Sequence, residues 1–212
     1  METKGVLSCN NNKAKANKMK RKEILEKKKK AMDELIKVAS AEKDHLSAFH
    51  AFRHYQKTVP ISLLLISFER FSICLSACLE SGTGDQLSSP LKHYIQNLLK
   101  ANMEGPYGTE WPVEEKVKRR EMIASEARYI FVYEALDANA NELLTVSEKE
   151  RTSGSCMEER GSLLGFVHFR FVIEEDLPVL YVYELQLESR VQGKGLGKFL
   201  MQLIELIARK GP

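Results

Sequence analysis

A glycine-rich segment between a strand pattern and a helix pattern limits the fold of this chain more than any other feature. The segment, QGKGLGKFL from Gln192 to Leu200, carries glycines at positions 193, 195 and 197. The residues before it, Val179 to Glu188, are rich in the aromatic and aliphatic side chains that favour strands. After it, apolar residues recur at helical spacing: Leu196, Phe199, Leu200, Leu203, Ile204 and Ile207. This succession predicts a helix that lies on a sheet, in an α/β or α+β fold.

The glycine corner has the chemistry of an anion site. A helix N-terminus exposes unpaired N–H groups and about half a positive charge. Glycines let the backbone approach a ligand closely, and Lys194 and Lys198 add charge. We therefore expect a phosphate or pyrophosphate here. A P-loop is excluded, because Phe199 stands where that motif needs a hydroxyl side chain, and Lys198 stands in place of the third glycine of the dinucleotide fingerprint.

Three strands are predicted in the second half of the chain. Arg128–Tyr133 and Leu163–Ile173 have strand composition, and we expect these two strands and Val179–Glu188 to be antiparallel neighbours. Residues 136–160 are polar and charged, and are predicted to form a long, flexible, exposed loop.

Two helices are predicted before these strands, from Ser88 to about Asn102 and from Val113 to Ser125. Between them, Gly105–Pro112 is predicted to be a loop that contains Tyr107 and Trp111. Aromatic side chains in such a loop are either walls of a binding site or anchors that fasten the loop to the core.

The N-terminal part of the chain is strongly basic. Residues 13–30 hold ten Lys or Arg and two Glu, a net charge of +8 in a chain whose total is +3. We expect a disordered leader over residues 1–12 and a helix over residues 13–57, because no Gly or Pro occurs between Lys13 and Thr58. The segment Lys13–Lys30 favours contact with nucleic acid or ribosomes, or a nuclear localisation signal. The alternative is a solvated helix face.

Membrane insertion and metal binding are not expected. Glu69 and Arg70 interrupt the apolar stretch Val59–Leu79, and a charge at a bilayer centre costs about 2.5–3.5 kcal/mol. Residues 61–79 fit three interpretations, namely a buried strand pair, a packed helix or an insertion, and the possible insertion begins at residue 59. The four cysteines and the pair His50 and His54 lack the spacing of a zinc site.

The corner also fits the pattern Gln-x-x-Gly-x-Gly, through Gln192, Gly195 and Gly197. Here the chain resembles the GNAT superfamily of N-acetyltransferases, whose corresponding loop binds the pyrophosphate of acetyl-CoA. The longer run from Tyr181 to Leu200 resembles the N-alpha-acetyltransferases of the NatD type, which acetylate the N-terminal serine of histone tails. The Lys-rich N-terminus, the segment around Tyr107 and Trp111, and the strand His168–Phe171 agree with this resemblance.

The resemblance implies a set of site residues. Glu184 corresponds to the proposed general base and lies among apolar residues of a strand. The backbone of Leu185, Gln186 and Leu187 would follow the pantetheine. The pyrophosphate would lie against Gly193, Lys194, Gly195, Leu196, Gly197 and Lys198. The peptide site would be lined by Tyr107, Trp111, Glu174 and Tyr183. The implied substrates are acetyl-CoA and a histone tail, acted on by a monomer in the nucleus and cytoplasm.

Three departures from that family pattern stand out. Val172 replaces a second acidic residue, so recognition of a basic tail would rest on Glu174, Glu175 and Asp176. Residues 59–76 have no counterpart in the family. The family also continues beyond this helix with further strands and a helix, so the acetyltransferase domain over residues 58–212 is expected to be truncated at its C-terminus and weakly active or inactive.

Two other functions remain open. The chain could be a GNAT enzyme that acts on lysine or small amines. It could also be a non-catalytic protein that binds nucleic acid or ribosomes through its basic arm.

Overall fold

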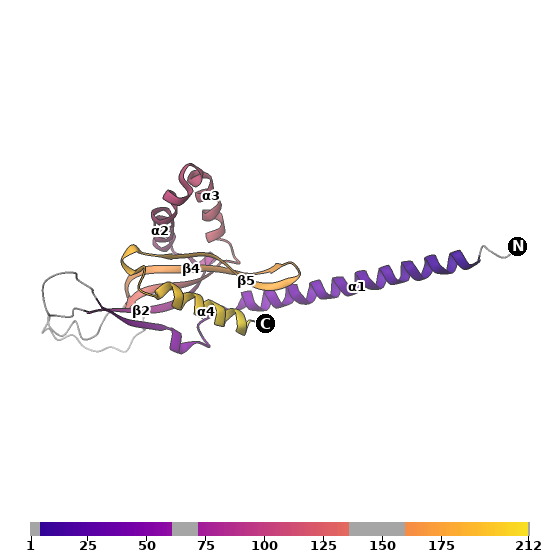
Figure 1. The fold of residues 1–212 in the computed structure, drawn as a ribbon, viewed down its shortest axis with the longest axis horizontal. Helices are drawn as coiled ribbons and strands as arrows, with labels where there is room; N and C mark the ends of the chain where they lie inside the picture. The colour runs from indigo at the N-terminus through magenta and orange to yellow at the C-terminus, as the bar shows by residue number, and fades with distance from the viewer. Residues whose placement is uncertain (1–4, 61–71, 136–159, 212) are drawn as a thin grey trace.

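The computed structural model describes residues 5–60, 72–135 and 160–211. Its centre is a five-stranded antiparallel sheet whose strands follow chain order, β1-β2-β3-β4-β5 (Figure 1). The strand bounds are β1 His54–Pro60, β2 Ser72–Thr83, β3 Arg128–Ala135, β4 Arg160–Glu174 and β5 Leu177–Leu187. This mixed helix and sheet architecture confirms the predicted fold class, and β3, β4 and β5 are the expected antiparallel neighbours.

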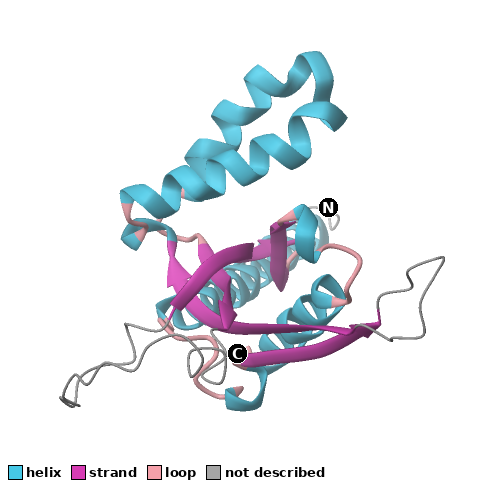
Figure 2. Ribbon diagram, turned by 90° about the vertical axis from the view of Figure 1, so that its left-hand side faces the viewer, coloured by secondary structure: helices cyan, strands magenta, loops and turns pink. Residues whose placement is uncertain are grey.

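Helices cover both faces of the sheet. The pair α2 (Ser89–Tyr107) and α3 (Trp111–Met122) stands on one face, and α4 (Leu196–Lys210) lies on the other (Figures 1 and 2). Each face has its own apolar core, and alternate residues of β3 enter opposite cores: Tyr129 faces α2 and α3, whereas Ile130 joins the core beneath α4. A strand buried on both faces accounts for the uninterrupted apolar run at this point of the sequence.

The N-terminal helix α1 (Gly5–Ala41) is longer at its start and shorter at its end than predicted. Its 37 residues span about 55 Å at 1.5 Å per residue, and most of that length extends away from the sheet (Figure 1). The expected disordered leader is therefore wrong for residues 5–12, because each residue added to an existing helix gains a hydrogen bond at little further cost. Residues 17–31 are exposed, and Met32 and Ala39 are the first to be buried.

The predicted helix over residues 13–57 is wrong beyond Ala41. The Asp44 carboxylate accepts a hydrogen bond from Leu46 N and forms an ion pair with Arg53. These two contacts stabilise a turn after the helix. The chain then enters β1, where the ring of Tyr55 is buried and each residue pairs with β2. The absence of Gly and Pro permits a helix but does not exclude a strand that gains a sheet partner.

The strand-pair interpretation of residues 61–79 is supported only in part. Ser72 to Leu79 form most of β2, but the antiparallel partner of β2 is β1, which ends at Pro60, before the predicted range. Residues 61–71 lie outside the described part of the chain, as does the predicted loop 136–160 apart from Arg160, the first residue of β4.

The predicted loop Gly105–Pro112 is mostly helical. α2 begins with Ser88 as its N-cap, as predicted, but continues through Tyr107. Gly108, at φ 54°, then redirects the chain into a single 3₁₀ turn before α3 begins at Trp111. Pro106 has no N–H for the helical hydrogen-bond pattern, and α2 ends one residue after it.

No helix among the described residues combines the length and apolar character needed to cross a membrane. Within the same residues, no group of three or more His, Cys, Asp or Glu side chains is arranged to hold a metal ion.

Candidate functional site

The glycine corner connects β5 to α4 through two left-handed residues. After the short 3₁₀ turn Ser189–Val191, Gly193 has φ 70° and Gly195 has φ 90°, values that side-chain-bearing residues rarely adopt. Gly195 is the N-cap of α4, and no side chain caps the helix there. The first turn of α4 therefore leaves N–H groups without a side-chain cap, and such groups can bind an anion.

Strand β1 supports this corner, which the sequence did not indicate. The Tyr55 hydroxyl donates a hydrogen bond to the Lys194 carbonyl at 3.1 Å. A Cβ atom on Gly195 would lie 2.8 Å from the Lys57 ammonium. Lys57 thus adds a third cation beside Lys194 and Lys198. No sequence signal could have found it, because the segment was predicted to be helical.

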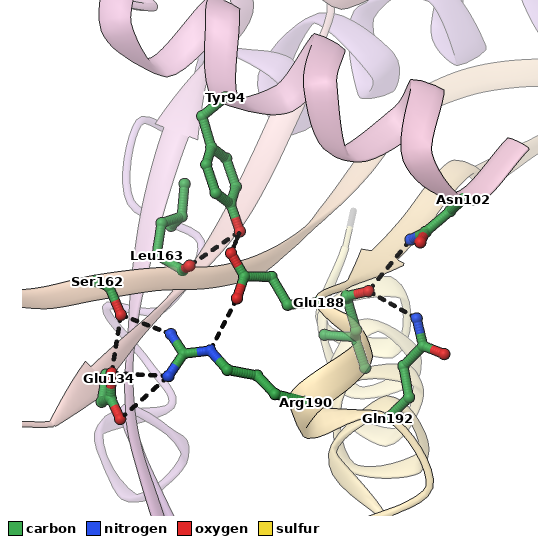
Figure 3. A network of polar contacts seen from close by, with 9 residues as sticks. Tyr94, Asn102, Glu134, Ser162, Leu163, Glu188, Arg190 and Gln192 are labelled. Carbon is green, nitrogen blue, oxygen red and sulfur yellow. Dashed lines mark hydrogen bonds and ion pairs between the residues drawn. The ribbon is translucent and has the colours of Figure 1, made fainter. Parts of the chain in front are cut away.

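A polar network fastens the chain just before the corner (Figure 3). Arg190 donates to Glu188 at 2.8 Å, to Glu134 at 3.2 Å and to Ser162 at 2.6 Å. The Tyr94 hydroxyl donates to Glu188 at 3.1 Å. These contacts join α2, β3 and β4 to the end of β5, so the corner has a defined position relative to the sheet.

Beside the corner, the edge of β5 borders an open cleft of about 320 Å³. It is lined by Leu185, Gln186 and Leu187 of β5 together with Asn102 and Gln192. The amides of Asn102 and Gln192 converge on the Leu187 carbonyl, at 3.1 and 2.8 Å (Figure 3). Because backbone groups alternate in direction along a strand, the Leu185 backbone points to the same open edge.

The side chain of Glu184 lies one residue beyond this cleft, on the face covered by α2 and α3. It is 8% exposed and forms an ion pair with Lys118 of α3. Burial disfavours the charge of Lys118, but the hydrogen bond and the charge of Glu184 outweigh it and raise the pKa of Lys118. The sequence did not predict Lys118, because its partner is 66 residues away.

A chain of amides leads from Glu184 back to the cleft. Gln186 Nε2 donates to the second carboxylate oxygen of Glu184 at 2.8 Å. Gln186 Oε1 accepts from Asn102 Nδ2 at 2.9 Å. Because Asn102 also contacts the Leu187 carbonyl, the carboxylate and the open strand edge share one hydrogen-bonded frame.

An irregularity in the sheet places Tyr183 next to Glu184. His168 pairs with Glu184 and Phe169 with Val182, so Tyr183 is the extra residue of a β-bulge. Its ring stacks on His168 at 5.0 Å, and the Arg170 guanidinium lies 4.6 Å from the ring centre. Burial, then the charges of Arg170 and Lys118, lower the pKa of His168 to about 3, so this ring is neutral at physiological pH.

The other residues predicted to bind the peptide, Tyr107, Trp111 and Glu174, lie at different distances from Glu184. Tyr107 lies near Glu184, with its ring centre 5.5 Å from the Lys118 ammonium. Trp111 is 3% exposed and packs in the core beside Tyr107, so it anchors the junction of α2 and α3. Glu174 is exposed at the β4–β5 hairpin, six residues along β4 from His168, which is about 20 Å. The structure therefore brings Tyr107 and Tyr183 to Glu184 but does not bring Glu174 there.

A second cavity, of about 310 Å³, lies between the end of α1 and the end of α4, and includes His45, Phe171 and Lys210 in its lining. It is on the face opposite Glu184. Burial lowers the pKa of His45 to about 4.

Residues 95–211 match the sequence profile of the acetyltransferase (GNAT) family. The match covers more than half of the 212 residues, so the chain belongs to this family. The GNAT domain implies transfer of an acetyl group from acetyl-CoA. The corner fits that co-substrate: it combines an uncapped helix N-terminus, two left-handed glycines and the Lys57 ammonium beside Gly195.

Proposed function

We propose that this protein is an N-alpha-acetyltransferase that acts on the N-terminal serine of histone tails. The observation that carries the proposal is the order of groups along β5. A buried carboxylate at Glu184 is followed by an open strand edge at Leu185–Leu187 and then by the anion-binding corner. That order matches the three parts of the reaction: an amine to deprotonate, a pantetheine arm to align and a pyrophosphate to hold.

In this proposal the corner and the strand edge act as the acetyl-CoA site. The N–H groups from Gly193 to Lys198 and the cations Lys194, Lys198 and Lys57 hold the pyrophosphate. The backbone of Leu185 and Leu187 aligns the pantetheine. When bound, acetyl-CoA supplies a thioester carbonyl as the electrophile.

Glu184 is the proposed general base. It takes a proton from the substrate's neutral amine, directly or through one water, as the nitrogen forms its bond to the acetyl carbon. The C–S bond would break as this bond forms, and CoA would leave as a thiolate that takes up a proton, so the products are the amide and free CoA. Gln186 keeps one carboxylate oxygen in position throughout, because its own amide is oriented by Asn102. Tyr107 and Tyr183 form the aromatic walls on the amine side.

The rest of the substrate and the basic arm define the proposed partners. The acidic hairpin residues Glu174, Glu175 and Asp176 attract the basic side chains of a histone tail. The exposed lysines from Lys18 to Lys30 on α1 favour contact with nucleic acid or ribosomes. The proposed enzyme is a monomer in the nucleus and cytoplasm.

Acetyl transfer from labelled acetyl-CoA to a Ser-Gly-Arg-Gly peptide tests the proposal. We expect label on the free peptide and none on the same peptide with an acetylated N-terminus. Label on neither peptide, at protein concentrations that bind acetyl-CoA, would contradict the proposal.

Transfer to a lysine side chain is a second candidate. The observation that favours it is that the ammonium in contact with Glu184 belongs to a lysine, Lys118. A peptide with a blocked N-terminus and one internal lysine separates the two functions. Label on this peptide and none on the Ser-Gly-Arg-Gly peptide would favour lysine acetylation.

A further inference from the structure

Lys118 lies in surroundings that suit a primary ammonium. Its Nζ atom contacts the Glu184 carboxylate and faces the ring of Tyr107, with the ring centre at 5.5 Å. The Lys118 and Glu184 side chains are only 13% and 9% exposed. A carboxylate and an aromatic face are the groups that recognise an alkyl ammonium. These two are also the base and an aromatic wall of the proposed amine site.

The place beside Glu184 where a substrate ammonium would bind is occupied by the ammonium of Lys118. The residues that line the open cleft begin at Leu185, one residue from Glu184. Lys118 Nζ holds the carboxylate oxygen Oε1, so a substrate amine can contact this oxygen only after the Lys118 ammonium has left it.

The contacts of the two carboxylate oxygens allow an exchange. Oε1 is held by Lys118, whereas Oε2 accepts from Gln186 Nε2 at 2.8 Å. Departure of Lys118 would therefore leave the carboxylate in place. Lys118 has a long flexible side chain, and Glu114 and Glu121 lie four residues before it and three residues after it on α3. Both are one helical turn away, so they offer the displaced ammonium another partner near the surface.

We propose that Lys118 is a specificity-determining place-holder: it occupies the position of the substrate's ammonium, and an incoming primary amine must displace it to reach Glu184. This inference rests on the proposed function and names the device that governs access to its base. Lys118 lowers the affinity of the protein for every amine that cannot itself contact both the Glu184 carboxylate and the Tyr107 ring. Because it remains a charged ammonium, it is displaced and not acetylated.

Peptide binding in the absence of acetyl-CoA tests the inference. We compare the wild-type protein with Lys118→Met, which keeps the length of the side chain and removes its charge, and with Lys116→Met as the matched control on the exposed side of α3. Calorimetry is performed with the Ser-Gly-Arg-Gly peptide and with its N-acetylated form.

For Lys118→Met we expect the free-amine peptide to bind about three- to tenfold more tightly, because one charge-assisted contact no longer has to be broken. Binding of the blocked peptide should stay unchanged, and Lys116→Met should leave both affinities as in the wild type. Equal or weaker binding of the free-amine peptide to Lys118→Met would overturn the inference. Acetylation of Lys118 itself, detected by mass spectrometry after incubation with acetyl-CoA, would also overturn it.

Removal of the lysine leaves a buried carboxylate without its cation, so folding is checked by thermal unfolding. Should Lys118→Met fail to fold, Lys118→Gln replaces it, since its amide can still donate to Glu184; the same tightening is expected, and its absence refutes the place-holder. The wild-type reaction is judged separately. Without acetyl-CoA binding and transfer the proposed function fails, whereas the peptide affinities still decide the role of Lys118.

Discussion

The two ends of the functional stretch of β5 are built in different ways. At the corner, the ligand-facing groups are backbone N–H groups, presented by glycines that are neighbours in the sequence. At Glu184, the important groups are side chains from α2, α3 and β4, brought together across the sheet. The comparison teaches that a site made of backbone groups can be predicted from a short stretch of sequence. A site made of charged side chains depends on which helices and strands pack against the strand.

The two ends should therefore respond to different substitutions. A change of charge at Glu184 should affect the rate of transfer, and a change of backbone freedom at the corner should affect the binding of acetyl-CoA. The predictions below test this separation.

Glu184→Gln should have the largest effect. It keeps the shape of the side chain but removes the base, so kcat should fall about 100- to 10,000-fold. The Kd for acetyl-CoA should stay within about twofold of the wild type, because the corner is unchanged. Glu205→Gln on the exposed face of α4 is the matched control. A large loss of acetyl-CoA affinity in Glu184→Gln, measured by calorimetry, would break the proposed separation of the two ends.

Gly195→Val should act at the other end. A side chain here is strained at φ 90° and would lie 2.8 Å from the Lys57 ammonium, and such backbone strain costs about 1–3 kcal/mol. We expect the Kd for acetyl-CoA to rise about ten- to 100-fold. Gly197→Ala is the control, because its Cβ would meet only ordinary contacts at 3.8 Å or more. Equal losses in the two variants would show that left-handed geometry is not what matters at Gly195.

The protonation of His168 should make the protein less stable in acid. Burial lowers the pKa of His168 to about 3, against about 6.5 in an unfolded chain. Below pH 6.5 the unfolded state gains a proton that the folded state does not bind, so stability falls as the pH falls towards 3. From pH 7 to pH 5 this residue should remove about 1–2 kcal/mol from the free energy of unfolding.

Urea unfolding of His168→Phe measures that contribution. The variant keeps an aromatic ring between Tyr129 and Tyr183 but cannot titrate. Its loss of stability between the two pH values should be smaller than that of the wild type by about 1–2 kcal/mol. His45→Phe, on the opposite face of the sheet, should reduce the loss of stability between pH 7 and pH 5 by a similar amount, because burial lowers the pKa of His45 to about 4. An unchanged pH dependence in His168→Phe would contradict the assignment.

Tyr55→Phe should have the smallest effect. It removes the hydrogen bond to the Lys194 carbonyl but keeps the packing of the ring against Phe199. A hydrogen bond of this kind contributes about 0.5–1.5 kcal/mol, so the Kd for acetyl-CoA should rise about two- to tenfold. Tyr181→Phe, on an exposed ring of β5, is the control. An unchanged affinity in Tyr55→Phe would mean that β1 does not support the corner.

Much of the C-terminal half could be predicted from the sequence. The strands around Tyr129, Phe169 and Leu185, the helix after Gly195 and the corner between them all follow local patterns of apolar residues and glycines. The N-terminal half was harder. The segment around Tyr55 lacks a helix breaker, and only pairing with β2 made it a strand.

The sequence by itself determined the alternation that sends Glu184 and Gln186 to one face of β5 and Leu185 and Leu187 to the other, because that alternation is a property of any strand. It also determined the glycines that shape the corner. Only the tertiary structure decided that Lys118 contacts Glu184, that Lys57 reaches the corner and that Trp111 is buried. These contacts join residues far apart in the chain, and no local pattern specifies which distant side chain will lie against a strand once the helices pack.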